Sequence, residues 1–264
     1  MKNMKPIVNF VFSIGHRCNS VDFLNDHKLR KMSSPFDYLY IDLETSLQII
    51  NNKFDDFLSD IILFNKNTRQ IELFYKKNTN EINTKLYDLI ENNIGYMAHN
   101  YNNVNLLFNQ NYLDEDKLND NLYNWNKICI FLHHYILDDN IYNSLKNRCQ
   151  RFNSIINKYN ETTALFYITK IINRENILDY INNVVDVKNK NNINCFIIII
   201  INCDNVNDNH FYNKADKCLF IIKKVENYES QYLKYQIDNN LNYEKEFNII
   251  LDHFTFNLIE KNKI

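Results

Sequence analysis

Four runs of consecutive β-branched and aromatic residues constrain the fold of this chain more than any other feature. A strand with one exposed face alternates apolar and polar residues, whereas an unbroken apolar run indicates a strand covered on both faces. The runs lie at residues 7–12, 164–169, 196–201 and 219–223, and residues 128–132 form a fifth candidate. They predict buried strands of a mostly parallel sheet.

Helical patterns separate these runs. Apolar residues recur at spacings of three and four over residues 43–57, 141–156, 177–185 and 244–260. Asp42 and Asp138 stand where N-caps are expected. Strands that alternate with helices predict an α/β fold in which the sheet is layered between helices.

The chain of 264 residues is long enough to bury one substantial core. We therefore expect a single α/β domain over residues 1–264. Residues 59–126 carry no clear strand pattern and only one helical pattern, at residues 81–92. We expect this segment to be an irregular insertion, or a lid over the edge where the strands end.

Composition excludes several classes of function. A net charge of −2 gives no electrostatic reason to bind nucleic acid. The longest apolar run, residues 195–201, is too short to span a bilayer. The sequence has no glycine-rich phosphate loop and no metal-ligand motif, so we expect no cofactor and no metal. Six cysteines without a C-x-x-C pair favour a reducing, cytoplasmic location.

The turn after the first apolar run carries the leading candidate for chemistry. Gly15 is one of only two glycines, and it stands where strand 7–12 ends. It permits a sharp turn and places Cys18 at the start of the next helix. A helix N-terminus lowers the pKa of a thiol, and the adjacent His16 and Arg17 act in the same direction. We predict that Cys18 is a nucleophile; the alternative is a core cysteine that packs the helix.

The partner of Cys18 is expected among the histidines. His133 and His134 follow the fifth apolar run, and Asp204 follows the third. If these strands are parallel, their carboxyl ends share one edge of the sheet with Cys18. Adjacent residues of an extended chain point to opposite faces, so only one of the two histidines can face the site. His99 is a reserve candidate.

Carboxylates and arginines complete the predicted site. Asp37 or Asp204 would orient the histidine, although an aspartate after Pro-Phe is also common in turns. The expected substrate contacts are Ser13, Gly15 and Arg17 at the turn, with Arg148 and Arg151 three positions apart on one helix. The two helical arginines could hold an anionic group or form a solvated flank.

Three motifs resemble those of a known family. They are S-I-G-H-R-C at residues 13–18, S-S-P-F-D-Y at residues 33–38 and F-D-D-F-L at residues 54–58. The chain resembles the papain-like cysteine peptidases of the DUF1796 type over residues 7–204. In register, His134 matches the family histidine, and Tyr135 replaces the aspartate that follows it. The order of strand, turn, cysteine and helix also resembles the nucleophile turn of α/β hydrolases.

The resemblance implies a cysteine-dependent hydrolase or acyltransferase in which Cys18 and His134 form the catalytic pair. The substrate would be a peptide, a glycan or a small molecule. Family members encoded near glycan-building genes suggest an alternative, a carbohydrate- or nucleotide-sugar-modifying enzyme. A third hypothesis is a non-enzymatic interaction module of a virus.

Overall fold

The computed structural model describes residues 4–16, 19–59, 61–65, 70–74, 105–109, 129–131, 136–169, 171–203, 206–225 and 243–261. The α-helices in these ranges are α1 (Asn19–Asp26), α2 (Leu43–Asn51), α4 (Asp139–Tyr159), α5 (Ile177–Lys190) and α7 (Glu244–His253). The strands are β1 (Ile7–Val8), β2 (Phe10–Ser13), β3 (Tyr40–Ile41), β4 (Ile61–Asn65), β5 (Gln70–Phe74), β6 (Asn105–Asn109), β7 (Cys129–Ile130), β8 (Thr163–Ile168), β9 (Phe196–Cys203), β10 (Asn209–Asn213), β11 (Cys218–Lys224) and β12 (Thr255–Phe256).

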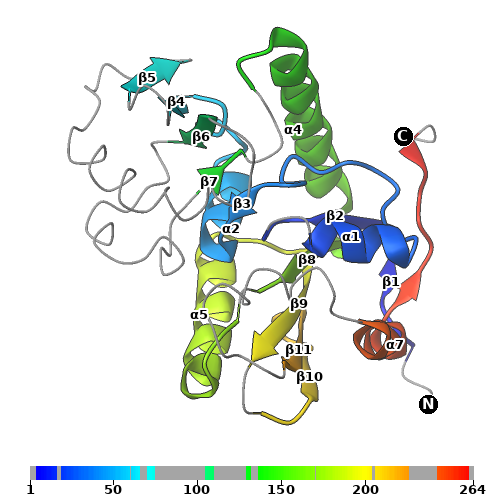
Figure 1. Cartoon of the computed structure of the whole chain (residues 1–264). Coiled ribbons are helices and arrows are strands. Elements are labelled where there is room, and N and C mark those ends of the chain that lie inside the picture. Colours follow the sequence, from blue (N-terminus) through cyan, green and yellow to red (C-terminus); the bar gives the residue numbers. More distant parts are fainter. Residues whose placement is uncertain are drawn as a thin grey trace.

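A five-stranded sheet in the order β10-β11-β9-β8-β2 forms the centre of the molecule (Figure 1). The pairs β2–β8, β8–β9 and β9–β11 are parallel, and only the edge strand β10 is antiparallel to its neighbour. Every residue of β8 and β9 is buried. The mostly parallel sheet predicted from the unbroken apolar runs is therefore confirmed.

Helices cover both faces of this sheet, as Figure 1 shows. Along β9, Ile197 and Ile199 pack in one core with residues of α2, α4 and α5. Ile198 and Ile200, which point to the other face, pack in a second core with residues of α1 and α7. This three-layer arrangement explains why the central parts of β8 and β9 are apolar. None of the helices in the described ranges has the length and apolarity needed to cross a membrane.

Two aspartates begin helices as expected. The Asp42 carboxylate accepts a hydrogen bond from the Thr45 amide at 2.8 Å, and α2 starts at the next residue. Asp138 accepts from the Asn140 amide at 2.8 Å at the start of α4. These bonds satisfy amide groups that have no partner inside the helix.

The helix predicted over residues 43–57 ends early, at Asn51. Lys53 and Phe54 have φ angles of 54° and 66°, in the left-handed region that a helix cannot contain. The chain therefore turns, yet Phe54 still packs on Phe36 and Phe57 at ring-centroid distances of 5.4 Å. An apolar pattern predicts which residues are buried even where the helix itself has stopped.

Both ends of the described chain meet in a small parallel sheet. The strand predicted over residues 7–12 is divided at Asn9, whose amide donates to the Thr162 carbonyl at 2.8 Å. Its first part, β1, pairs with β12. The helix predicted over residues 244–260 consequently ends at His253, because the chain beyond it pairs as this strand.

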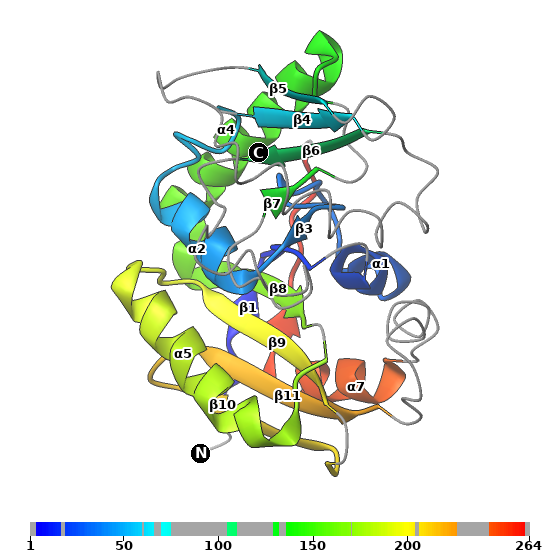
Figure 2. The ribbon, with the colours of Figure 1, turned by 60° about the vertical axis from the view of Figure 1, so that its left-hand side comes forward.

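A second five-stranded sheet, in the order β3-β7-β6-β4-β5, was not predicted. All of its pairs are antiparallel. Figure 2 shows it above the central sheet, with β5 near the top and β10 near the bottom of the molecule. Strands β4, β5 and β6 come from the predicted insertion at residues 59–126, whereas the predicted helix 81–92 lies outside the described residues.

The fifth candidate strand, residues 128–132, was assigned to the wrong sheet. Its described part is β7, which pairs antiparallel with β3 and β6. The expectation that His133 and His134 leave a parallel strand beside Cys18 is therefore corrected. A short apolar run shows that a strand is buried without showing its partner or its direction.

Candidate active site

The chain makes a tight turn between β2 and α1, and Gly15 is required there. Its φ angle is +111°, which residues with a side chain rarely adopt. A Cβ atom at this position would lie 2.5 Å from Ile41 Cγ2 and 3.0 Å from the Ile41 carbonyl oxygen. The turn is therefore pressed against β3. Arg17 and Cys18, the next part of the motif, lie outside the described residues.

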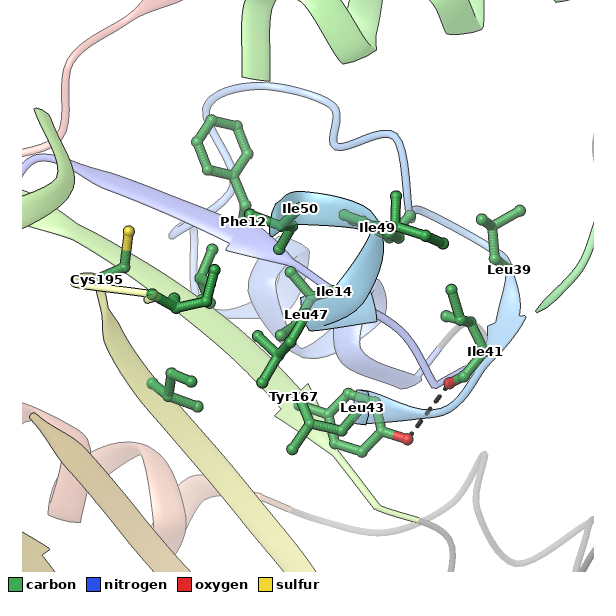
Figure 3. Packing of buried hydrophobic residues seen from close by; sticks show 14 of the residues in the cluster. Phe12, Ile14, Leu39, Ile41, Leu43, Leu47, Ile49, Ile50, Tyr167 and Cys195 are labelled. Atoms are coloured by element: carbon green, nitrogen blue, oxygen red, sulfur yellow. Dashed lines mark hydrogen bonds between the residues drawn. The ribbon is translucent and has the colours of Figure 1, made fainter. Parts of the chain in front are cut away.

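Aromatic side chains surround the described part of this turn. The His16 ring is buried, with its centroid 4.8 Å from that of Tyr40 and 6.3 Å from that of Tyr167. Tyr167 donates a hydrogen bond to the Ile41 carbonyl at 3.3 Å, as Figure 3 shows. Burial raises the pKa of this phenol well above its usual value, so Tyr167 stays neutral. Sequence reasoning treated His16 only as a basic neighbour of Cys18 and missed this packing.

Both arms of the turn are fixed to β8. The Ile14 amide donates to the Phe166 carbonyl at 3.0 Å, which continues the pairing of β2 past its last residue. On the other arm, the Ser20 hydroxyl accepts a hydrogen bond from the Ile168 amide at 3.0 Å. The sequence indicated neither contact, because the partners are distant along the chain. The first turn of α1 is therefore held at the carboxyl end of β8.

The carboxyl ends of β8 and β9 are joined by a buried amide. The Asn202 backbone donates to Thr169 Oγ1 at 3.1 Å, and its side-chain amide donates to the Thr169 carbonyl at 3.0 Å. The same side chain contacts Tyr243 Oη at 3.3 Å, just before α7. Asp204, the predicted orienting carboxylate, lies outside the described residues. Cys203 before it is buried in the core and ends β9 at this edge.

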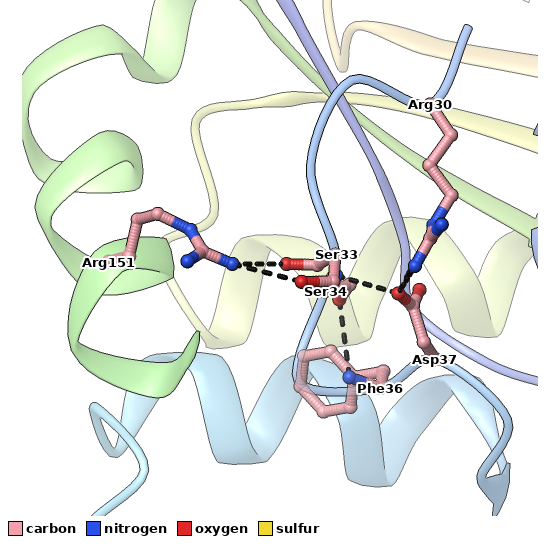
Figure 4. A network of polar contacts seen from close by, with 6 residues as sticks. All are labelled: Arg30, Ser33, Ser34, Phe36, Asp37 and Arg151. Carbon is pink, nitrogen blue, oxygen red and sulfur yellow. Dashed lines mark hydrogen bonds and ion pairs between the residues drawn. The ribbon is translucent and has the colours of Figure 1, made fainter. Parts of the chain in front are cut away.

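Asp37 is held within its own loop, as Figure 4 shows. Its Oδ2 atom lies 2.7 Å from Arg30 Nη2 and accepts from the Ser34 amide at 2.9 Å. Burial raises the pKa of the carboxyl group above its usual value, and the charge of Arg30 opposes this rise. These contacts are those of a turn-forming residue, the alternative considered from the sequence.

Arg151 is anchored to the same loop. Its Nη2 atom donates to the Ser33 carbonyl at 2.9 Å and to the Ser33 hydroxyl at 3.1 Å (Figure 4). Burial lowers the pKa of Arg151, and the charge of Arg148 acts in the same direction. The charge of Arg148 also opposes the rise in the pKa of Asp37. Arg151 uses its hydrogen bonds to hold the loop.

His133 and His134 lie outside the described residues, but their flanks are buried. Phe131 packs on Phe57 with ring centroids 5.5 Å apart, and Ile136 is buried in the same core as Ile14. Phe131 and Ile136, the described residues on either side of the two histidines, therefore both belong to the core that contains Ile14.

The helix that follows this segment runs antiparallel to β2. Phe10 packs on Tyr159 at 5.1 Å, and Phe12 packs on Phe152 at 4.8 Å. Because residue numbers fall along α4 as they rise along β2, the start of α4 lies toward the carboxyl end of β2.

Five of the six cysteines are described, and all five are buried and form no disulfide. Burial raises the pKa to about 12 for Cys149, Cys195 and Cys218, and well above its usual value for Cys129. A buried thiol with such a pKa is neither ionised nor accessible at neutral pH. The sixth cysteine, Cys18, lies outside the described residues.

Other described histidines pack against aromatic rings. The His27 ring stacks on that of Phe247 with centroids 4.0 Å apart, and the ring centroids of His253 and His210 are 5.5 Å apart. His99 lies outside the described residues. Within the ranges described above, no group of three or more histidine, cysteine, aspartate or glutamate side chains could hold a metal ion.

The comparison with known proteins gives one match. No curated protein and no solved structure matches the chain significantly. Residues 9–206 match a family whose description reads "Putative papain-like cysteine peptidase (DUF1796)". The match includes the Gly15 turn, the loop of Asp37, α4 and the strands β8 and β9. The chain therefore belongs to the DUF1796 family.

Proposed function

We propose that this protein is a cysteine-dependent hydrolase or acyltransferase with Cys18 as its nucleophile and His134 as its general base and acid. The supporting observation is a chain of contacts between the two segments. Gly15 touches Ile41, and Ile41 pairs with Cys129 in the second sheet. Cys18 is three residues beyond Gly15, and His134 is five beyond Cys129.

Chain length allows the two side chains to meet. An extended chain spans at most about 3.5 Å per residue. The segments from Gly15 and from Cys129 can therefore reach about 10 Å and about 17 Å from their anchors. These anchors lie next to each other across Ile41, so a Cys18–His134 pair needs no rearrangement of the described fold.

The electrostatic surroundings favour a thiolate at Cys18. The residue precedes the first residue of α1, whose free amide groups carry a partial positive charge. Arg17 adds a full charge next to it in sequence. The five other thiols are buried, and none of them offers a competing nucleophile.

In the proposed reaction the Cys18 thiolate attacks the carbonyl carbon of an acyl substrate. A C–S bond forms, and the C=O π electrons move to the oxygen, where the amide groups at the start of α1 stabilise the charge. The bond to the leaving group then breaks, and His134 donates the proton that this group needs. Water or another acceptor releases the acyl group from the thioester.

The remaining charged residues have separate roles in this proposal. Asp204, directly after β9, orients His134. Asp37 and Arg151 hold the loop of residues 33–37 in place. Arg17 and Arg148 bind an anionic part of the substrate, which would be a peptide, a glycan or a small ester. The free thiols suit a reducing compartment, and we assign the protein to the cytoplasm.

The test is to trap the thioester. The protein is incubated with p-nitrophenyl acetate, and acetylation is located by peptide mass spectrometry. We expect acetyl-Cys18 in the wild type, none in Cys18→Ala, and formation slowed by about 10²-fold or more in His134→Ala. A greater loss in His133→Ala than in His134→Ala would assign the base to the neighbouring histidine.

The same experiment can contradict the proposal. If no acetyl group is found on Cys18 while the protein is folded, acyl transfer is excluded. Stabilisation by nucleotide-sugars in a thermal-shift assay would then support the sugar-modifying alternative. If neither acetylation of Cys18 nor stabilisation by nucleotide-sugars is observed, the result would support the hypothesis of a non-enzymatic interaction module.

A further inference from the structure

Two buried side-chain atoms that flank the turn between β2 and α1 make no hydrogen bond. They are Ser13 Oγ at the end of β2 and Asn19 Nδ2 at the start of α1. The two residues are only 1% and 6% exposed. An unsatisfied buried polar group costs about 1–3 kcal/mol. A cost of this kind on both sides of one turn requires an explanation.

Neighbouring polar groups at the same edge of the sheet are satisfied. Ser20, one residue after Asn19, accepts a hydrogen bond from the Ile168 amide. The side-chain amide of Asn202 donates to two oxygen atoms, one on Thr169 and one on Tyr243. The fold can therefore satisfy a buried asparagine at this edge. The lack of an acceptor for Asn19 is specific to its position.

The direction of the Asn19 side chain follows from helix geometry. Side chains of an α-helix lean toward its N-terminus. Asn19 is the first residue of the eight-residue helix α1, so its Cα–Cβ bond is tilted toward the N-terminal end of the helix. The residue immediately before it is Cys18. The backbone amides of the first helical turn point the same way.

We propose that the side-chain amide of Asn19 binds the oxyanion that forms when Cys18 attacks an acyl substrate. This inference rests on the proposed function and adds a catalytic residue to it. The unsatisfied group, Nδ2, is a donor, as the negative oxygen of a tetrahedral intermediate requires. The substrate oxygen is the acceptor that the free protein lacks.

Two reactions of the same thiol separate the role of Asn19 from that of Cys18. Iodoacetamide alkylates the thiolate by displacing iodide, and no oxyanion forms. p-Nitrophenyl acetate acylates it through a tetrahedral oxyanion and releases p-nitrophenolate. Loss of one oxyanion donor slows the second reaction by about 10²–10³-fold. The same loss leaves the rate of alkylation by iodoacetamide unchanged.

The decisive variant is Asn19→Ala. We expect it to acylate about 10²–10³-fold more slowly than the wild type while Cys18 is alkylated at the wild-type rate. Asn19→Asp should lose at least as much, because a carboxylate repels the oxyanion. Asn25→Ala, at an exposed position of the same helix, serves as the matched control and should match the wild type in both reactions.

Stability provides a second readout. Because Asn19 Nδ2 has no partner to lose, Asn19→Ala should unfold at the wild-type temperature or above it. A lower unfolding temperature together with equal losses in both reactions would show a structural role and overturn the inference.

The outcomes distinguish the two levels of the argument. Acylation of Asn19→Ala at the wild-type rate would overturn the role of Asn19 and leave the Cys18 proposal intact. A folded wild-type protein whose Cys18 is neither alkylated preferentially nor acylated would overturn both.

Discussion

Gly15 and Ile41 touch at the point where the first strand of the parallel sheet ends. A Cβ atom on Gly15 would lie 2.5 Å from Ile41 Cγ2, so there is no room for any side chain. Ile41 belongs to β3, the edge strand of the antiparallel sheet. This contact links the turn that carries Cys18 to the sheet that leads to His134, and the proposed catalytic pair depends on it.

Gly15→Ala is expected to destabilise the protein by at least about 2 kcal/mol, because strained backbone and overpacking each contribute. The measurement is urea denaturation followed by circular dichroism. Ser154→Ala, at an exposed position of α4, should change stability by less than about 0.5 kcal/mol. Equal stability of the two variants would show that the turn can move away from Ile41.

The charge of Asp37 should oppose folding, even though Arg30 lies beside it. Burial raises the pKa of this carboxyl above its usual value of 3.8, so the folded protein holds the proton more tightly than the unfolded chain does. The contribution of Asp37 to stability is therefore complete at low pH and is lost as the pH rises through the folded-state pKa.

Asp37→Asn tests whether the charge of Asp37 opposes folding. The amide keeps an acceptor for the Ser34 amide without a charge, so the variant should be at least as stable as the wild type at neutral pH. Its advantage should shrink as the pH falls toward 4. Asp37→Ala, which loses the acceptor, should cost about 1–3 kcal/mol. A large loss of stability in Asp37→Asn at neutral pH would show that the ion pair with Arg30 dominates.

A largely buried ion pair joins β11 to α7. Lys223 Nζ lies 3.1 Å from Glu246 Oε1, and the side chains are only 13% and 2% exposed. Lys223 also lies over the Tyr243 ring, 5.0 Å from its centroid. Breaking such a pair leaves a buried charge, so Glu246→Gln should cost about 3 kcal/mol.

The neighbouring residue in the same helix provides the control for this prediction. Lys245 Nζ lies 2.6 Å from Asp208 Oδ2, but both side chains are far more exposed. Lys245→Gln should therefore change the free energy of unfolding much less than Glu246→Gln, as urea titrations of both variants can show. Similar effects of the two substitutions would mean that burial does not decide the strength of the pair.

Much of the fold could be predicted from the sequence because burial leaves a periodic pattern. The apolar runs of β8 and β9 stood out for this reason. The caps at Asp42 and Asp138 stood out because aspartate accepts hydrogen bonds from the free amides of a helix start. Strand partners leave no such pattern. The run at residues 128–132 therefore suggested a parallel strand, although β7 is short and pairs in the antiparallel sheet. The irregular insertion concealed three strands of that sheet.

The candidate site was predictable where local chemistry is sufficient. The motif at residues 13–18 predicted the Gly15 turn and the helix after it. Contacts between distant segments gave no signal, among them the packing of His16 on Tyr167. The same is true of the missing partner of Asn19, because an unsatisfied amide is a property of the folded core. The roles of Cys18 and His134 stay predictions.

The most direct test of the account is the reactivity of the six thiols in the native protein. Limiting iodoacetamide is applied over a pH series, and each cysteine is followed by peptide mass spectrometry, with urea-unfolded protein as the control in which all six react. We predict that Cys18 reacts far faster than the five buried cysteines, with an apparent pKa well below the free value of about 8.5. If Cys18 reacts no faster than the other five, or with an ordinary pKa, it is not a catalytic nucleophile and the account is wrong.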